Sequence, residues 1–207
     1  MALGSKTSSR GSIVAAAFIA VLLAAGGGML WFVEHRPAAG LGSAVAIGGP
    51  FSLTDGDGKA VTDQTYRGKY LLVYFGYTYC PDVCPTTLTN VAAALDKLGP
   101  RADRLQPLFI TVDPNRDTPA VVKQYAAAFS PRLIGLTGSP EQIKAVAHEY
   151  RVYYAVHRTG PGPNDYAMDH SSILYLMGPD GKFLSVVPAD AGADTIAADL
   201  QRQLPSS

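Results

Sequence analysis

The order of apolar and polar positions from residue 50 onward alternates between strand and helix patterns. The apolar run LLVYF at 71–75 is typical of a strand buried on both faces. Residues 86–98 then place Leu88, Val91 and Leu95 at helical spacing. Two further strand and helix pairs follow, at 105–113 with 118–129 and at 133–138 with 139–152. This alternation predicts an α/β domain whose sheet is mostly parallel and covered by helices.

Two hairpins frame this central unit. Residues 50–62 hold apolar runs on both sides of the turn sequence DGDG, and residues 171–187 do the same around GPDG. Because hairpin strands are antiparallel, we expect them to make the sheet mixed. Residues 194–204 predict a final helix.

The first part of the chain carries one long apolar segment. Residues 13–33 contain no charged side chain, and a helix of this length spans a hydrocarbon core of roughly 30 Å. We predict a single transmembrane anchor there, with residues 1–12 in the cytoplasm, because basic residues precede the segment. A cleaved signal peptide is the alternative. Residues 34–49 then predict a flexible tether, and 50–207 a single domain outside the cytoplasm.

Charge and cysteine content narrow the function. The chain has 17 basic and 17 acidic residues and no basic run, which argues against a nucleic-acid partner. Its two cysteines, Cys80 and Cys84, lie where the strand at 71–75 turns into the following helix. That edge of an α/β sheet favours functional sites, and a helix amino terminus stabilises thiolates.

The spacing of this cysteine pair is compatible with a redox couple, with two metal ligands or with a structural disulfide. Sulfurs bound to one metal lie no more than about 4.6 Å apart, which side chains four apart can reach. A disulfide requires Cys80 to lie in the loop before the helix, because its Cβ atoms must approach to about 4 Å. A purely structural disulfide is the weakest reading, since so short a loop gains little stability.

Histidine is the ligand that would complete a metal site. His35 flanks the apolar segment, His148 lies in a predicted helix and His157 begins a predicted loop at 157–169. His170 follows that loop and precedes the strand at 171–177, so it could reach the sheet edge. Two thiolates with one imidazole suit copper(I) and could open toward copper(II). From the residues alone, a ligand role and a structural role for His170 remain equally open.

Three motifs resemble the Sco/SenC family of thioredoxin-fold copper proteins. They are YFGYTYCPDVCPTTL at 74–88, TVDPNRDTPAVVKQY at 111–125 and MDHSSILYLMGPDG at 168–181. The resemblance implies a thioredoxin-like fold behind one transmembrane helix, and one copper ion bound by Cys80, Cys84 and His170. It further implies assembly of the copper A centre of cytochrome c oxidase, by copper donation, by reduction of the oxidase subunit's thiols, or by both.

The hypothesis is therefore a membrane-anchored copper chaperone in a bacterial inner membrane, with its domain in the periplasm. A mitochondrial inner membrane facing the intermembrane space is the alternative location. We expect the copper A subunit and other periplasmic copper carriers as partners. The rival function is a metal-independent thiol–disulfide oxidoreductase or peroxidase, in which Cys80 and Cys84 are catalytic and His170 tunes a thiol.

Several neighbouring residues carry finer expectations. Tyr79 stands where many relatives have a histidine, which we expect to remove only an extra copper(II) contact. We expect Asp169 to orient His170. Asp113, Arg116 and Asp117 are interpreted as structural or partner-docking residues, and a structural role is favoured because a helix start follows directly.

Overall fold

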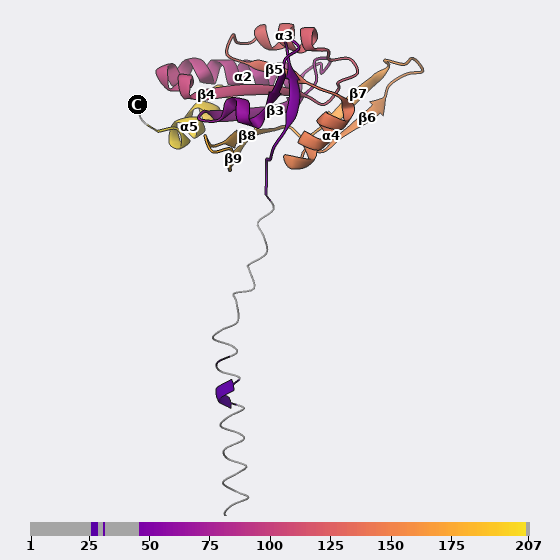
Figure 1. Cartoon of the computed structure of the whole chain (residues 1–207). Helices are drawn as coiled ribbons and strands as arrows, with labels where there is room; N and C mark the ends of the chain where they lie inside the picture. Colours follow the sequence, from indigo (N-terminus) through magenta and orange to yellow (C-terminus); the bar gives the residue numbers. More distant parts are fainter. Residues whose placement is uncertain (1–25, 29–30, 32–45, 206–207) are drawn as a thin grey trace, which may run out of the picture. The chain divides into compact units, whose positions relative to one another are not determined.

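The computed structural model describes residues 26–28, 31 and 46–205, and the chain divides into two units, Met1–Ala44 and Val45–Ser207 (Figure 1). Nearly all of the predicted anchor at 13–33, the segment 1–12 and most of the tether lie outside the described residues. Among the residues that are described, no helix has the length and apolar character needed to cross a membrane. The anchor therefore stays a prediction.

The second unit is built on a seven-stranded mixed sheet with strand order β2-β1-β5-β4-β3-β8-β9. Only β3, β4 and β5 run parallel, and every other pairing is antiparallel. The expectation of a mostly parallel sheet was wrong, because the two hairpins occupy both edges, while the mixed sheet is confirmed. The strands are β1 Ser52–Asp55, β2 Ala60–Thr62, β3 Tyr70–Gly76, β4 Leu105–Thr111, β5 Ile134–Thr137, β8 Ile173–Met177 and β9 Phe183–Pro188.

Four helices pack around this sheet: α2 Val83–Leu98, α3 Pro119–Ala127, α4 Pro140–Glu149 and α5 Ala193–Gln203. Two short 3-10 helices, η1 Asp63–Tyr66 and η2 Gly99–Arg104, precede β3 and β4. Thr118 and Ser139 cap α3 and α4 through their side-chain oxygens, as their positions predicted. Helix α2 begins three residues earlier than predicted, so Cys84 lies inside its first turn.

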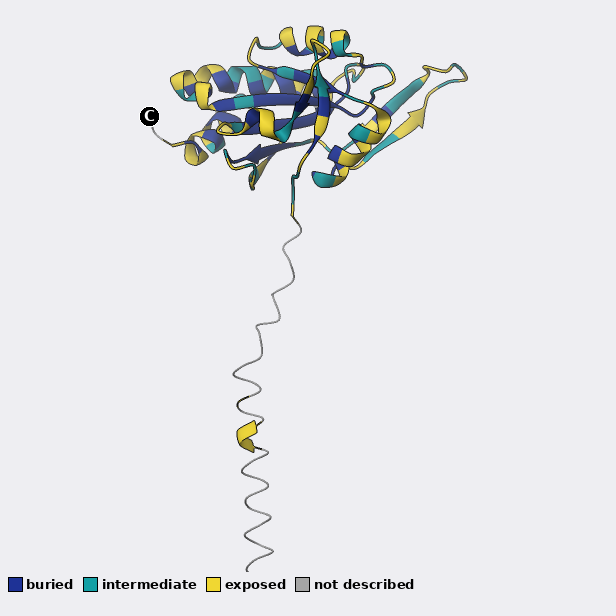
Figure 2. Cartoon of the chain, viewed as in Figure 1, coloured by how far each residue is buried: buried dark blue, intermediate teal, exposed yellow. Residues whose placement is uncertain are grey.

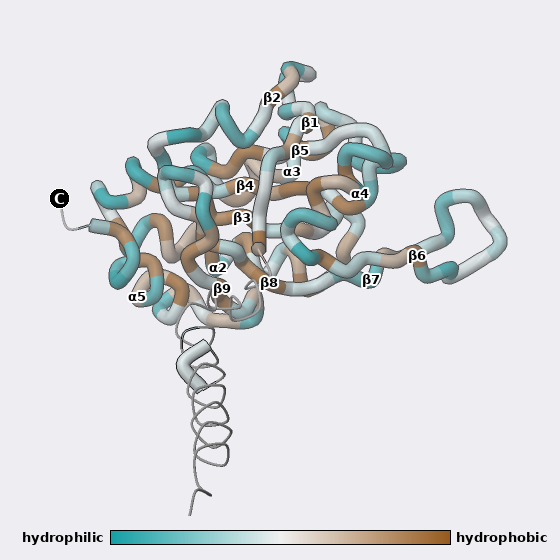
Figure 3. The backbone as a smooth tube through the Cα atoms, turned by 60° about the horizontal axis from the view of Figure 1, so that its bottom comes forward, coloured by the Kyte–Doolittle hydropathy of each residue, from teal (hydrophilic) through white to brown (hydrophobic). Residues whose placement is uncertain are grey.

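The core lies along the central strands. Figure 2 shows β3 and β4 as buried, and Figure 3 shows hydrophobic segments running through the same strands. Val73 and Phe75 of β3 and Leu108 and Ile110 of β4 are fully buried. The prediction of a strand buried on both faces is thus confirmed for LLVYF, and this rigid strand leads directly into the cysteine loop.

Strands β6 Tyr154–Arg158 and β7 Tyr166–His170 pair with each other in a separate two-stranded sheet, hereafter the ribbon. Figure 1 shows the ribbon projecting from the body of the domain. The predicted loop at 157–169 was therefore wrong, since only 159–165 form the turn. The glycines and prolines mark that turn, whereas the flanking strands lack the apolar alternation by which strands are recognised.

Arg151 offers a test of local backbone strain. It follows α4 with φ of 56°, and the amide of Val152 donates to the carbonyl of Ala147 at 2.8 Å, so the helix ends in a Schellman motif. Glycine adopts this conformation without steric cost, so Arg151→Gly should raise the free energy of unfolding by about 1 kcal/mol. Denaturant unfolding measures this change. Arg151→Ala is the matched control and should gain nothing, and an equal gain for both variants would contradict the strain argument.

Candidate metal centre

Cys80 and Cys84 lie on two sides of the start of α2. Cys80 belongs to the loop between β3 and α2 and is half-buried, whereas Cys84 is fully buried in the first helical turn. The backbone amide of Cys84 donates to the sulfur of Cys80 at 3.4 Å, and both residues are free thiols. Because Cys80 precedes the helix, the pair meets the condition set for a disulfide as well as that for a shared metal.

Gly76, the last residue of β3, lets the sulfur of Cys84 lie against the strand. A Cβ atom built at Gly76 would lie 2.8 Å from this sulfur, which is closer than real side chains approach. The hydroxyl of Tyr74 donates to the same sulfur at 3.7 Å. The end of the buried strand thus fixes one ligand atom of the candidate site.

The pKa values of the two thiols are shifted in opposite directions. A hydrogen bond from the Cys84 thiol to the Cys80 sulfur is the main reason why the pKa of Cys80 is lowered, against the opposing effect of its burial. The same interaction, together with burial, raises the pKa of Cys84. The half-exposed sulfur of Cys80 is therefore the thiolate, and it is the atom that a metal or a disulfide would meet first.

His170 ends β7 and faces the two cysteines. Its Nε2 lies 3.4 Å from the sulfur of Cys84, and its Nδ1 lies 3.2 Å from the carbonyl oxygen of Ser171. A carbonyl only accepts hydrogen bonds, so Nδ1 donates to it, and Nε2 is the ring nitrogen that faces the sulfurs and would bind a metal in the neutral imidazole. The rings of Tyr74 and Tyr77 meet the imidazole edge-on, with centroid distances of 6.2 and 5.9 Å.

The expectation that Asp169 orients His170 was wrong. Successive side chains of a strand point to opposite faces, and Asp169 is exposed. The carbonyl of Ser171 performs this role instead. Every residue has a backbone carbonyl, so nothing in the sequence indicated that this one would accept the hydrogen bond.

The three candidate ligands come together as one cluster. The two sulfurs and an imidazole nitrogen all lie within 4.8 Å of one another, so small side-chain rotations bring each within bonding distance of one ion. Two thiolates with one neutral imidazole form a donor set suited to copper. No other such group of three occurs among the residues described. His148 and His157 are exposed on α4 and β6, and His35 lies outside those residues.

The carboxylate of Asp117 anchors the loop that carries Cys80. This fully buried carboxylate accepts hydrogen bonds from the Thr78 amide at 3.0 Å, the Thr78 hydroxyl at 2.6 Å and the Thr111 hydroxyl at 2.5 Å. Burial is the main cause that raises its pKa. The structural role favoured for Asp117 agrees with these contacts, but sequence reasoning missed that it anchors Thr78, two residues before Cys80.

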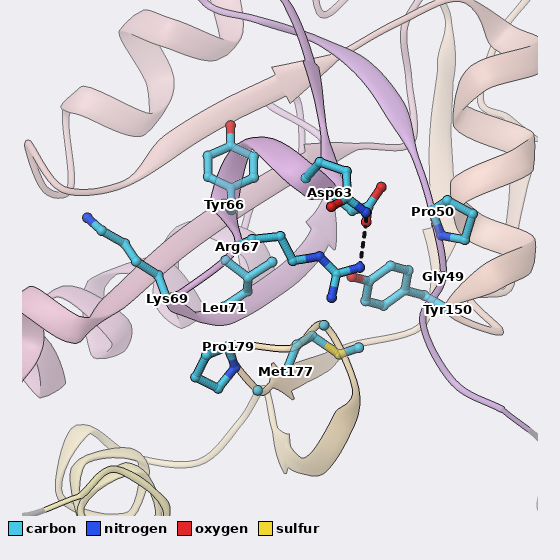
Figure 4. A pocket seen from close by; sticks show the side chains of 13 residues that line it. Gly49, Pro50, Asp63, Tyr66, Arg67, Lys69, Leu71, Tyr150, Met177 and Pro179 are labelled. Atoms are coloured by element: carbon cyan, nitrogen blue, oxygen red, sulfur yellow. Dashed lines mark hydrogen bonds and ion pairs between the residues drawn. The ribbon is translucent and has the colours of Figure 1, made fainter.

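Cavities elsewhere on the domain do not contain the cluster. One of about 320 Å³ lies at the opposite end of β3 and is lined by Tyr66, Arg67, Lys69 and Tyr150 (Figure 4). Arg67 pairs there with Asp63 at 2.9 Å. A more open groove of about 370 Å³ is lined by Thr78, Tyr79 and Tyr125, so it borders the cysteine loop.

Comparisons with known proteins agree with the fold and the motifs. The SCO1/SenC family model matches residues 40–205. SenC of Rhodobacter capsulatus is 48% identical over 159 residues, which cover 76% of this chain and 71% of SenC. The human mitochondrial SCO1 homolog is 45% identical over 160 residues, or 74% of this chain and 52% of that protein. The chain spans about half the length of the human and Arabidopsis thaliana homologues.

Solved structures show the same architecture. Copper-bound ScoI of Bradyrhizobium japonicum is 48% identical with a TM-score of 0.70, covering 77% of this chain and all of that one. Copper-bound ScoI of Arabidopsis thaliana is 45% identical with a TM-score of 0.71, covering 76% and 98%. The thioredoxin-like fold expected from the motifs is thereby confirmed, and the chain belongs to the SCO1/SenC family.

Proposed function

We propose that this chain is a copper chaperone that binds one copper ion through Cys80, Cys84 and His170. The observation that carries the proposal is the convergence of two sulfurs and an imidazole nitrogen, all within 4.8 Å of one another, with Nε2 facing the sulfur of Cys84. Relatives of 45–48% identity have been solved with copper bound, which supports the same cargo here. A relative of 26% identity is described as a member of the Sco family of cytochrome c oxidase assembly proteins.

The recipient in this proposal is the subunit of cytochrome c oxidase that carries the copper A centre. Residues 13–33 would anchor the domain to the membrane, with 34–49 as the tether. The location would be the periplasmic face of a bacterial inner membrane, or the intermembrane-space face of a mitochondrial one. Other periplasmic copper carriers would supply the ion.

Copper binding would depend on the redox state of the cysteines. The reduced pair offers two thiolates, whereas transfer of two electrons from them to a client disulfide joins the sulfurs of Cys80 and Cys84, turns the client into two thiols after it takes up two protons, and leaves no thiolate ligand. Oxidation should therefore release the ion. Affinity should also fall as pH drops, because protons compete with the metal for the sulfurs and for Nε2.

Anaerobic titration of the reduced protein with copper(I) against a competing chelator tests the site. His170→Ala should lower copper affinity more than about tenfold, because an imidazole ligand is lost. His157→Ala is the matched control, since this exposed histidine lies on the same ribbon and should have no effect. Equal affinities for wild type and His170→Ala would rule out the three-ligand site.

A thiol–disulfide oxidoreductase is the second candidate function, and the lowered pKa of the half-exposed Cys80 favours it. In this reaction the Cys80 thiolate attacks a client disulfide and Cys84 resolves the mixed disulfide, so the client is reduced as the pair is oxidised. His170→Ala distinguishes the two functions. It should weaken copper binding while leaving dithiol exchange largely intact.

A further inference from the structure

The candidate metal centre is assembled from two parts of the domain that belong to different sheets. Cys80 and Cys84 come from the segment between β3 and α2, while His170 comes from the end of the ribbon. The ribbon forms its own sheet and does not extend the ladder of the central one. The chain ties His170 to the central sheet at one end, because β8 begins at Ile173, and side-chain contacts that join the ribbon to the cysteine loop fix the ribbon at the other.

Arg116 makes these contacts from the segment between β4 and α3. Its Nη1 donates to the backbone carbonyl of Tyr166 at 2.9 Å and to that of Asn164 at 3.3 Å, both at the ribbon. Its guanidinium carbon lies 3.7 Å from the ring centroid of Tyr166 and 4.6 Å from that of Tyr79. Tyr79 directly precedes Cys80, so one side chain touches both pieces of the site.

The surroundings of Arg116 hold it in one place. Its side chain is only 9% exposed, and it pairs with Asp113, whose side chain is 2% exposed. The other oxygen of Asp113 accepts a hydrogen bond from the hydroxyl of Tyr166 at 2.8 Å. Arg116, Asp113 and Tyr166 thus form a closed network, hereafter the clasp, in which the cation and the ribbon are held by the same carboxylate.

Stability alone is a poor explanation for this arrangement. Within the described part of the chain, Nη2 of Arg116 is buried without a hydrogen-bond partner, which costs free energy. Buried ion pairs are also often no more stabilising than apolar residues of similar size. What an apolar residue could not do is bond to the ribbon backbone and stack on the cysteine loop at once.

We propose that Arg116 is a positioning residue that couples the ribbon to the cysteine loop and so sets the reach of His170 to the copper ion. The inference rests on the proposed function, because it assigns His170 as a ligand. Without the clasp the cysteines would still offer two sulfurs to copper(I), but the imidazole would be held beside them less firmly. Arg116 then acts through His170 and touches no copper itself.

A double-mutant cycle with copper titration tests this coupling. Arg116→Met should lower copper affinity by about 10- to 100-fold in the wild-type background. In the His170→Ala background the same substitution should change the affinity by no more than about a factor of two, because the ligand through which it acts is gone. The copper(II) spectrum of Arg116→Met should also lose the features that come from a bound imidazole nitrogen, and the spectrum of His170→Ala should lose the same features.

Two further variants serve as controls for the substitution of Arg116. Arg158→Met is the matched control, because Arg158 bonds mainly to the ribbon's own turn at Gly162 and Pro163, and it should bind copper as wild type does. Arg116→Lys keeps the charge beside Asp113 and should fold, yet it should show the same His170-dependent loss, since an ammonium cannot stack and bond two carbonyls as a guanidinium does. Full rescue by lysine would overturn the proposal.

The remaining outcomes separate this inference from the proposed function. If His170→Ala binds copper as wild type does, the three-ligand site fails. If His170→Ala lowers copper affinity but Arg116→Met does not, only the positioning role fails. The same holds if Arg116→Met lowers the affinity equally in the wild-type and His170→Ala backgrounds. Amide hydrogen exchange of the metal-free protein gives an independent reading, because Arg116→Met should increase exchange in β6 and β7 while β3 and β4 stay protected.

Discussion

Replacing Cys84 by serine is expected to remove tight copper(I) binding, with a loss of affinity of more than about 100-fold. The thiol of Cys84 hydrogen-bonds to the sulfur of Cys80, and its own sulfur lies 3.4 Å from Nε2 of His170. A serine hydroxyl does not ionise near neutral pH and is a hard ligand, so a soft copper(I) ion would keep only one thiolate and one imidazole. Anaerobic competition titration measures the loss.

The fold should survive this substitution, which makes the copper result interpretable. Serine is slightly smaller than cysteine, so it fits against Gly76, and the hydroxyl of Tyr74 can donate to its oxygen as it does to the sulfur. The metal-free variant should therefore unfold cooperatively, at a midpoint close to that of wild type. Cys80→Ser is the companion variant and should lose affinity similarly. Undiminished copper binding by folded Cys84→Ser would remove this sulfur from the ligand set.

Much of the central sheet could be predicted because its strands are continuous apolar runs. LLVYF is buried on both faces, and such a run has few alternatives to a central strand. The ribbon was not predicted because β6 is mostly exposed and β7 is mostly half-buried, so neither strand shows a clear alternation of apolar and polar residues. The helix predicted to begin at residue 86 includes Pro85 in its first turn. A proline in the first turn loses no helical hydrogen bond, and the helix begins at Val83.

The candidate site divides in the same way. Cys80, Cys84 and His170 were placed by their motifs, and the structure brings the three together. Arg116 and Asp117 were interpreted as structural or partner-docking residues, and a structural role was favoured because Thr118 and Pro119 account for that segment locally. Their contacts reach residues 78 and 166, which are far away in the sequence. Contacts of this kind follow from tertiary packing and have no local pattern to reveal them.

Removal of the Asp117 carboxylate should be the most destabilising single change near the site. Asp117→Ala leaves the amide and hydroxyl of Thr78 and the hydroxyl of Thr111 without their buried acceptor. Each orphaned donor costs about 1–3 kcal/mol, so we expect a loss of about 4 kcal/mol in the free energy of unfolding, measured by denaturant. Copper affinity should fall as well, because Thr78 holds the loop that carries Cys80.

Asp117→Asn separates the hydrogen bonds from the charge. The amide oxygen can still accept from Thr78 and Thr111, and its NH₂ group can donate to a hydroxyl that reverses its role, so the loss should be much smaller than for alanine. Little difference between the two variants would show that these hydrogen bonds do not stabilise the loop.

The asparagine variant also isolates the titration of the carboxylate. Burial raises the pKa of Asp117 above its usual 3.8, so the folded protein binds this proton more readily than the unfolded chain does. The stability that this group contributes is complete below the unfolded value and is lost as pH rises through the folded one. Asparagine does not titrate. The stability of Asp117→Asn relative to wild type should therefore improve as pH rises through that window, whereas a decline would mean that the folded protein prefers the ionised carboxylate.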